Sequence, residues 1–297
     1  MIDRIHRPDE RRTEFLLIGV ALIWALNAPL VKYGLMLLDV YVFNGIRYIV
    51  ATLLIAGLLF TRQKWNPVMS EDWPRFVRLG FLANVAYQLM YILGIKWTTA
   101  GNSSVLLSTS PLWTTYVNAR MQKERVPPQA IVGMVVSMTG IILMIVGSGM
   151  KLEFGSNALF GDLLSLSAAI LWALNTTLQK PLLVRYSSTQ LSLISIGIGA
   201  VALSLLAVPS TTALAWRTIP LKAYFVPVVS GGASIALANV WWSRGVKVIG
   251  PRRTAVYNNL VPVVAFIASY FMLHEEVYAI QALGAAFTVL GVWVARR

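Results

Sequence analysis

The five residues IWALN at positions 23–27 return as LWALN at positions 171–175, which lie 148 positions later in the chain. Further matches follow at a second, steady spacing of 151 positions. They pair Gly94, Lys96, Pro111, Glu124, Gly133, Ser137 and Gly140 with Gly245, Lys247, Pro262, Glu275, Gly284, Thr288 and Gly291. Two registers three residues apart indicate an internal duplication with a small insertion.

The composition predicts that both copies lie in a membrane. Of the 297 residues, 57% are hydrophobic and only 12% are charged, whereas a soluble domain carries about 25% charged residues. The chain has no cysteine, which excludes disulfides and thiolate sites, and its two histidines, His6 and His274, lie near opposite ends. We therefore expect an integral membrane protein with no metal site and no cofactor.

Ten stretches are long and apolar enough to cross a bilayer as helices, which takes roughly 20 residues each. They lie near 15–37, 41–61, 74–95, 99–119, 128–149, 158–179, 189–208, 221–243, 253–272 and 277–295. The predicted fold class is an all-α integral membrane protein with ten transmembrane helices. A polar tail at 1–14 precedes a first five-helix repeat at 15–150 and a second at 157–295. Because five is an odd number, the second repeat must be inverted relative to the first.

Lysine and arginine are distributed unevenly between the two sets of loops. Most lie in the tail and loops on the side of the N-terminus, and the opposite side holds only Lys32, Lys96, Lys151, Arg217 and Lys222. Cytoplasmic loops carry such an excess, so we expect a bacterial inner-membrane protein with both termini in the cytoplasm. The net charge of +13 then reflects membrane orientation, and no nucleic-acid partner is expected.

Inverted repeats indicate a function as well as a fold. Secondary transporters use them because exchanging the conformations of the two halves converts an inward-open state into an outward-open one. The alternative is a duplicated scaffold without a transport role. A membrane enzyme would need a nucleophile with a base, or metal ligands, and a channel would need a ring of like residues. Neither a nucleophile–base pair nor a set of metal ligands is apparent in the sequence, so we do not expect an enzyme.

Several motifs resemble one known family over about 15–295. They are the two WALN segments and the residues Phe43, Arg47 and Ala51, which lie four positions apart. They also include Pro111 with Glu124-Arg125, and Pro262 with Glu275-Glu276. The chain resembles the EamA branch of the drug/metabolite transporter superfamily, and within it the YddG-type aromatic amino-acid exporters. The resemblance implies a ten-helix fold with a central cavity between the halves, and export of amino acids or similar metabolites. The seventh span has no arginine that matches Arg47.

The predicted substrate is therefore an amino acid or similar small metabolite, exported by alternating access, with a multidrug exporter of the same superfamily as the alternative. A nucleotide-sugar antiporter would need more basic residues inside the spans to bind phosphates. All twelve acids lie at termini, in loops or near span ends. We therefore expect neutral or zwitterionic substrates, and proton coupling only through end groups such as Asp162, His274 or Glu275. The expected partners are the substrate and the lipid bilayer, and a two-repeat unit can act as a monomer.

Polar side chains inside a bilayer face the protein interior or a water-filled cavity. In the third span such residues recur at helical spacing and share one face, and the eighth span carries a matching set. The predicted cavity residues are Asn84, Tyr87, Gln88 and Tyr91 in the third span and Ser234, Asn239 and Trp242 in the eighth. The alternative is hydrogen bonding between helices without ligand contact.

The fourth and ninth spans each contain a proline, which leaves the carbonyl four residues earlier without its helical partner. Such carbonyls persist beside polar partners or a cavity, so these spans are predicted to be kinked and to line the pathway. Their candidate residues are Asn102, Ser104 and Ser108 before Pro111, and Tyr257 and Asn258 before Pro262. The alternative is a structural kink whose carbonyls bond serine hydroxyls.

Trp24 and Trp172 lie deep in their spans, each three residues before an asparagine, Asn27 and Asn175. These pairs can flank the cavity, with the indoles stacking on an apolar substrate and the amides bonding it, or they can pack the core between the halves. Arg47 is the one basic residue placed inside a span. It can attract a carboxylate, but we favour a structural role in which it reaches outward and bonds loop carbonyls.

Two stripes of small residues recur in the fifth and tenth spans. They comprise Gly133, Ser137 and Gly140, and Gly284, Thr288 and Gly291. Small residues let two helix backbones approach closely in a membrane. We therefore predict that these stripes pack against neighbouring helices and do not contact substrate.

Overall fold

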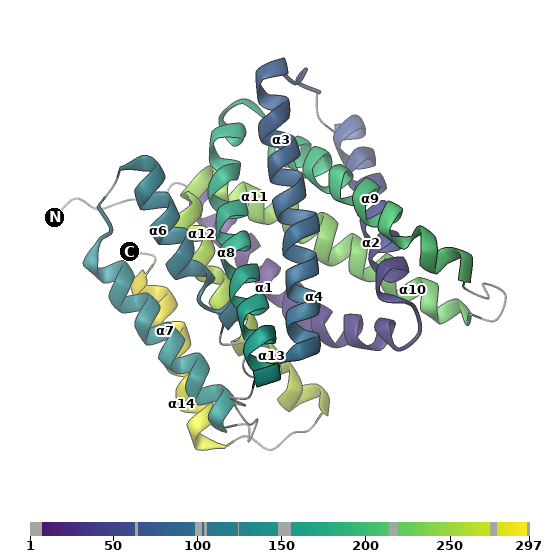
Figure 1. Ribbon diagram of the computed structural model, residues 1–297. Coiled ribbons are helices and arrows are strands. Elements are labelled where there is room, and N and C mark those ends of the chain that lie inside the picture. Colours follow the sequence, from purple (N-terminus) through teal and green to yellow (C-terminus); the bar gives the residue numbers. More distant parts are fainter. Residues whose placement is uncertain are drawn as a thin grey trace.

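The computed structural model (Figure 1) describes residues 8–62, 65–98, 103, 106–123, 125–147, 156–213, 219–273 and 278–295. All regular secondary structure in these residues is helical. Helices satisfy the backbone hydrogen bonds of a segment internally, which is what a bilayer requires.

The elements of the first predicted repeat are α1 (Pro8–Leu35), α2 (Val40–Arg62), η1 (Ser70–Asp72), α3 (Trp73–Gly80), η2 (Phe81–Ala86), α4 (Tyr87–Trp97), α6 (Ser110–Gln122) and α7 (Pro128–Gly147). α2 begins where the Asp39 carboxylate accepts hydrogen bonds from the backbone N–H groups of Tyr41 (3.0 Å) and Val42 (3.4 Å). Such a cap satisfies donors that the first turn leaves unpaired.

The elements of the second predicted repeat are α8 (Ser156–Arg185), α9 (Ser188–Ala213), α10 (Leu221–Ser230), η4 (Gly231–Leu237), α11 (Ala238–Ile249), α12 (Pro251–Val256), η5 (Tyr257–Asn259), α13 (Leu260–Leu273) and α14 (Ala279–Ala295). Gly250 separates α11 from α12 with a φ of +83°, a backbone conformation that glycine adopts without strain. Pro251 then opens α12, where its missing N–H costs nothing.

Six helical segments in the described part of the chain are long and apolar enough to cross a membrane. They are Val40–Thr61, Ser70–Gly94, Pro128–Gly147, Leu159–Arg185, Ser188–Thr211 and Ala223–Ile249. α14 is apolar but shorter. The multi-pass membrane character is thus confirmed, while the count of ten spans and the five-plus-five arrangement stay predictions.

Two continuous helical segments contain a π-helical stretch, and the two stretches lie at matching places. η2 covers 81–86 and η4 covers 231–237, so the shift of 151 residues found in the sequence places one stretch on the other. A π-helical stretch widens the helix and occurs often at functional sites. The sequence analysis did not predict either stretch.

The principal helix contacts join the first half of the chain to the second. α1 packs against α11, α4 against α8, α2 against α9, and α7 against α14. In the predicted duplication α1 corresponds to α8 and α4 to α11, so the first two contacts are equivalent to each other. The two halves therefore interlock.

The two small-residue stripes meet each other between α7 and α14. Gly133 lies against the backbone of Gly291 and Ala295, and Gly140 lies against Gly284 and Thr288. A Cβ atom at either glycine of α7 would overlap backbone atoms of α14. This close approach of two backbones is what small residues permit in a membrane.

Candidate functional site

Three tryptophans from three helices form the centre of the candidate site. The Trp24 ring of α1 lies 5.3 Å from Trp172 of α8 and 5.2 Å from Trp242 of α11, and Trp172 lies 5.5 Å from Trp242, all between ring centroids. These are normal distances for favourable aromatic pairs. The sequence analysis named all three residues, and the structure brings them into one group.

Two tyrosines of α4 extend this group. Tyr87 packs against Trp172 with 5.1 Å between centroids, and Tyr91 stacks on Tyr87 at 5.9 Å and an interplanar angle of 11°. We call Trp24, Tyr87, Tyr91, Trp172 and Trp242 the aromatic cluster. Its rings pack against one another between the two halves, at the place where an open central cavity was expected. Trp24, Tyr87 and Tyr91 keep part of their surface exposed, whereas Trp172 and Trp242 are buried.

The indole nitrogens of the aromatic cluster differ in their hydrogen bonds. Trp24 Nε1 donates to the backbone carbonyl of Ser234 in η4 (3.2 Å), and Trp242 Nε1 donates to Thr176 Oγ1 (3.2 Å). Trp172 Nε1 is buried and has no hydrogen-bond partner among the residues that the structure describes. A buried donor left unpaired costs about 1–3 kcal/mol, so this N–H is available to an acceptor on a ligand.

The two asparagines predicted beside the tryptophans bond protein groups. Asn27 Oδ1 accepts a hydrogen bond from the Ser230 hydroxyl (2.6 Å), which joins α1 to α10. Asn175 Oδ1 accepts one from Gln179 Nε2 (2.9 Å), one turn further along α8. In this state the amides support the helices that carry the aromatic cluster.

The predicted polar stripes also contact neighbouring helices. Asn84 Nδ2 donates to the carbonyl of Ser195 in α9 (2.9 Å), and Gln88 Nε2 donates to Asn44 Oδ1 in α2 (3.1 Å). Asn239 Nδ2 donates within its own segment to the carbonyls of Ser234 and Ile235. Helix-to-helix bonding, the alternative left open above, is therefore what Asn84 and Gln88 do here.

A small polar pocket lies beside the stripe. Its volume is about 10 Å³, near the minimum that holds one water molecule. It is lined by Ala83, Asn84, Asn175, Gln179, Leu191, Ser192, Ser195, Ile196, Asn239 and Ser243. The structure thus brings together three predicted residues, Asn84, Asn175 and Asn239. The sequence analysis missed the serines and Gln179, although Gln179 lies four residues after Asn175, on the same helix face.

Each of the two prolines follows a short irregular stretch in its helical segment. Pro111 lies in the first turn of α6, after a turn at 108–109, and Pro262 lies in the first turn of α13, after η5. Proline is well tolerated in a first turn because its missing N–H would have no helical partner there. The regular α-helix is thus interrupted before each proline, and the lining of a pathway by these spans stays a prediction.

The other candidate residues of these two spans are distributed as follows. Ser108 and Tyr257 are buried, and Asn258 Nδ2 donates to Ser110 Oγ (3.1 Å), which joins η5 to α6. Asn102 and Ser104 lie outside the described residues. This segment therefore contributes a contact between the halves.

Arg47 differs from the outward-reaching side chain that we favoured. Its residue exposure is 5%, and its one hydrogen bond to a described residue goes to Asn44 Oδ1 (2.9 Å) on its own helix. The guanidinium lies over the Phe43 ring, 5.5 Å from the centroid. The prediction of bonds to loop carbonyls is wrong because the side chain stays inside the protein.

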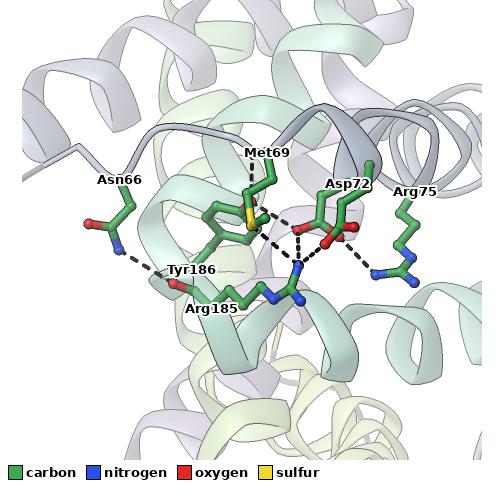
Figure 2. A network of polar contacts seen from close by, with 7 residues as sticks. Asn66, Met69, Asp72, Arg75, Arg185 and Tyr186 are labelled. Carbon is green, nitrogen blue, oxygen red and sulfur yellow. Dashed lines mark hydrogen bonds and ion pairs between the residues drawn. The ribbon is translucent and has the colours of Figure 1, made fainter.

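Ion pairs connect the two halves at one end of the helices. We call this end the basic end, and its basic residues are Arg75, Arg185, Arg244, Lys247 and Arg253. Figure 2 shows Asp72 between Arg75 and Arg185, with the Tyr186 hydroxyl beside it. Asp72 accepts hydrogen bonds from Arg75 (2.8 Å), Arg185 (3.0 Å) and Tyr186 (3.0 Å). Glu71 lies 2.5 Å from Arg185. This network ties η1 to the end of α8.

A second group of ion pairs at the basic end holds α1 against α11 and α12. Arg253 pairs with Glu10 and Glu14 at 3.3 Å each, and Arg244 pairs with Asp9. Lys247 Nζ donates to the carbonyl of Tyr186 (3.1 Å), which connects this group to the network of Asp72. The sequence analysis did not find these pairs, because their members lie more than 100 residues apart.

Two matches with one protein family cover most of the chain. The profile of the EamA-like transporter family matches residues 11–146 and again residues 159–297. The chain belongs to the EamA-like transporter family. This confirms the family predicted from the motifs, and it makes the protein a membrane transporter of that family.

Full-length relatives of this EamA-like transporter are also transporters. An uncharacterized transporter of Archaeoglobus fulgidus is 28% identical over 95% of this chain and 96% of its own. The uncharacterized transporter YyaM of Bacillus subtilis is 23% identical over 82% of this chain and 80% of its own. A probable terminal-alkyne amino-acid exporter of Streptantibioticus cattleyicolor is 25% identical over 95% and 92%.

A solved crystal structure shares the fold of this EamA-like transporter. It aligns with 96% of this chain and 98% of its own at a TM-score of 0.80 and 15% sequence identity. At that identity the likeness shows the fold alone.

Proposed function

We propose that this EamA-like transporter exports amino acids, including aromatic or apolar ones, across a bacterial inner membrane by alternating access. In this proposal two inverted five-helix repeats cross the membrane with both termini in the cytoplasm. The observation that carries it is the contact between Trp24 and Trp172, 5.3 Å apart. These residues are counterparts in the two repeats, and counterparts touch where a pseudo-two-fold axis passes between them.

Three other features support the inverted duplication. The family profile matches the chain twice, the π-helical stretches η2 and η4 correspond, and Thr288 Oγ1 bonds the carbonyl of its counterpart Ser137 (3.4 Å). Alternating access follows from such an arrangement, because each half can adopt the conformation of the other. In this proposal the ion pairs of the basic end hold the two halves together on the cytoplasmic side.

The aromatic cluster supports an apolar or aromatic side chain in the substrate. Indole and phenol rings offer large apolar faces, and Trp172 Nε1 offers one unpaired donor. A relative carries the name of an amino-acid exporter. The narrower assignment to the YddG-type exporters depends on motifs that the whole branch shares, and it is part of this proposal.

Counterflow in proteoliposomes tests the proposal. Vesicles loaded with unlabelled tryptophan, phenylalanine or leucine should accumulate the labelled amino acid in a saturable manner. Trp172→Ala should reduce that accumulation strongly, while Trp65→Ala, at an exposed ring of the loop after α2, should not. Absence of saturable counterflow across a panel of the twenty amino acids would refute the proposal.

The same vesicles separate an amino-acid exporter from the multidrug alternative. A buried carboxylate is the natural partner of a cationic drug. Among the described residues, no Asp or Glu side chain forms a hydrogen bond with a residue of the aromatic cluster. A dicationic dye should therefore compete poorly with tryptophan. Tight dye binding that tryptophan does not displace would favour the multidrug exporter.

A further inference from the structure

Arg47 places a positive charge inside the membrane-spanning part of the protein. It lies seven residues after the start of α2, roughly 10 Å along the helix, within the span Val40–Thr61. Its exposure is 5%. A charge at such a position is costly, and it is normally paired with another group or used for function.

No carboxylate among the described residues pairs with Arg47. The ion pairs of the described residues are made by Arg75, Arg185, Arg244 and Arg253, all at the basic end. Of its five N–H donors, Arg47 uses one, toward Asn44, and its Nε is buried without a partner. The guanidinium therefore holds unused donors of the kind that bind a carboxylate through two parallel hydrogen bonds.

The single hydrogen bond of Arg47 does not join different elements. Arg47 and Asn44 lie three residues apart on α2, and Phe43 beneath the guanidinium lies on α2 as well. The contact between α2 and α4 is made by Gln88 and Asn44 without the arginine. The contact between α2 and η4 is made by Gly231 against the backbone of Arg47. The guanidinium is thus not needed to hold these helices together.

The second repeat shows that the fold is built without this charge. The shift of 148 residues aligns the start of α2 with the start of α9. In this alignment Ser195 corresponds to Arg47, and Ser192 corresponds to Asn44. Ser195 Oγ donates to the carbonyl of Ser192 (3.3 Å), and the packing of α9 needs no cation. The arginine is thus present in the first repeat and not at the corresponding position of the second. This difference indicates a role other than folding.

The surroundings of Arg47 lead directly to the aromatic cluster. Asn44 Oδ1 accepts hydrogen bonds from both Arg47 (2.9 Å) and Gln88 (3.1 Å). Gln88 follows Tyr87 of the aromatic cluster in α4, so the hydrogen bond from Gln88 connects Asn44 and Arg47 to the helix that carries Tyr87 and Tyr91. A ligand that holds a carboxylate at Arg47 can therefore place an apolar group against the rings.

We propose that Arg47, oriented by Asn44, is the subsite that binds the carboxylate of the transported substrate. The inference deepens the proposed function, since it names the group by which an amino acid is held next to the aromatic cluster. Arg47 Nε is buried in this structure, so we expect the carboxylate to reach the guanidinium after the neighbouring groups move. Asn44 acts as a positioning residue that keeps the guanidinium directed away from the lipid.

Binding of a matched pair of ligands to the full-length protein in nanodiscs tests this subsite. The probes are indole-3-propionate and indole-3-propionamide, which share the ring and differ in the carboxylate. By calorimetry the wild type should bind the carboxylate at least about tenfold more tightly than the amide, as expected for a charge-assisted pair. Arg47→Gln should remove that preference, and Arg47→Lys should keep part of it because lysine retains the charge but not the planar fork.

The control variant is Arg78→Gln, which removes one positive charge from an exposed position of α3 and should keep the wild-type preference. Equal affinity of the wild type for both probes, binding of neither, or an unchanged preference in Arg47→Gln would each overturn the subsite. If Arg47→Gln does not fold, the preference of Arg47→Lys decides, and an undiminished preference there also counts against the proposal.

Transport assays separate failure of the subsite from failure of the proposed function. Amino-acid counterflow with the same kinetics in Arg47→Gln and wild type would leave the exporter intact and reject the subsite. A carboxylate preference that depends on Arg47, in a protein that shows no amino-acid counterflow, would retain the subsite and reject the substrate class.

Discussion

Arg47 and Arg185 carry the same guanidinium in opposite surroundings. Arg185, whose side chain is 47% exposed at the basic end, meets two carboxylates, Glu71 at 2.5 Å and Asp72 at 3.0 Å. Arg47 is buried in a span and meets no described carboxylate. The first arginine joins two halves of the protein, and the second makes its one hydrogen bond on its own helix.

The difference indicates a structural role for Arg185 and a ligand-binding role for Arg47. An ion pair at a helix end keeps part of its hydration and closes a contact between helices. An unpaired cation inside a span is unfavourable until a partner arrives. A transporter can use that property, because the substrate itself then supplies the missing charge.

Supplying Arg47 with an internal acid should produce the largest effect. In Asn44→Asp the new carboxylate lies where Oδ1 now accepts from Arg47 at 2.9 Å, so it competes with the substrate. We expect counterflow of amino acids to fall by about tenfold or more while the protein stays folded. Asn66→Asp, which adds the same charge in an exposed loop, should transport normally, and equal activity of both variants would contradict the comparison.

Removing the carboxylate of Asp72 should make the protein open more easily at the basic end. The chain has no cysteine, so Ala83→Cys at the polar pocket supplies a single thiol for labelling. Asp72→Asn leaves Arg185, Arg75 and Tyr186 without their shared carboxylate and should raise the labelling rate by about fivefold, on the order of the change expected for a network of several bonds. Glu71→Gln, at a side chain that is 58% exposed, should change the rate by less than about twofold. Equal effects of the two variants would contradict this ranking.

Replacing each arginine by methionine should separate the two roles by stability. Arg185→Met removes an ion pair that joins two elements and should lower the melting midpoint. Arg47→Met removes an uncompensated buried charge and should leave the midpoint unchanged or raise it by about 2 °C. Thermal unfolding in detergent measures both. A large loss of stability in Arg47→Met would show that the guanidinium supports the fold.

A pH gradient should have the smallest effect. Proton relays inside membranes use buried Asp, Glu or His, and the described acids in ion pairs with arginine lie at the basic end, away from Arg47. Amino-acid uptake should therefore change by less than about twofold when a pH gradient is imposed across the vesicle membrane. A strict requirement for the gradient would contradict this expectation.

Much of the aromatic cluster could be predicted from the sequence. Trp24 and Trp172 were found because a repeated pattern marks them, and Tyr87 and Trp242 because polar and aromatic residues follow a helical spacing that needs no tertiary information. That these rings pack against one another is shown only by the tertiary structure.

The parts that sequence reasoning missed share one physical cause. The pairs of Asp72 with Arg185 and of Glu10 with Arg253 join residues 113 and 243 positions apart, and periodicity reports only on neighbours along a helix. In the π-helical stretch η4, the carbonyl of Ser234 accepts hydrogen bonds from both Asn239 and Trp24 of α1, and the second of these joins residues 210 positions apart. Local propensity contains no signal for either feature.

The sequence alone indicated that this protein lies in a membrane, that its two halves share a repeated pattern, and that it resembles the EamA transporters. Those properties follow from composition, spacing and motifs, which can be read along the chain without knowing how it folds. Only the tertiary structure decided that Trp24 meets Trp172, that Arg185 pairs with two carboxylates, and that Arg47 meets no carboxylate among the described residues. Burial and pairing depend on how helices distant in sequence interlock, and a hydrogen bond forms only when that packing brings donor and acceptor within about 3 Å of each other.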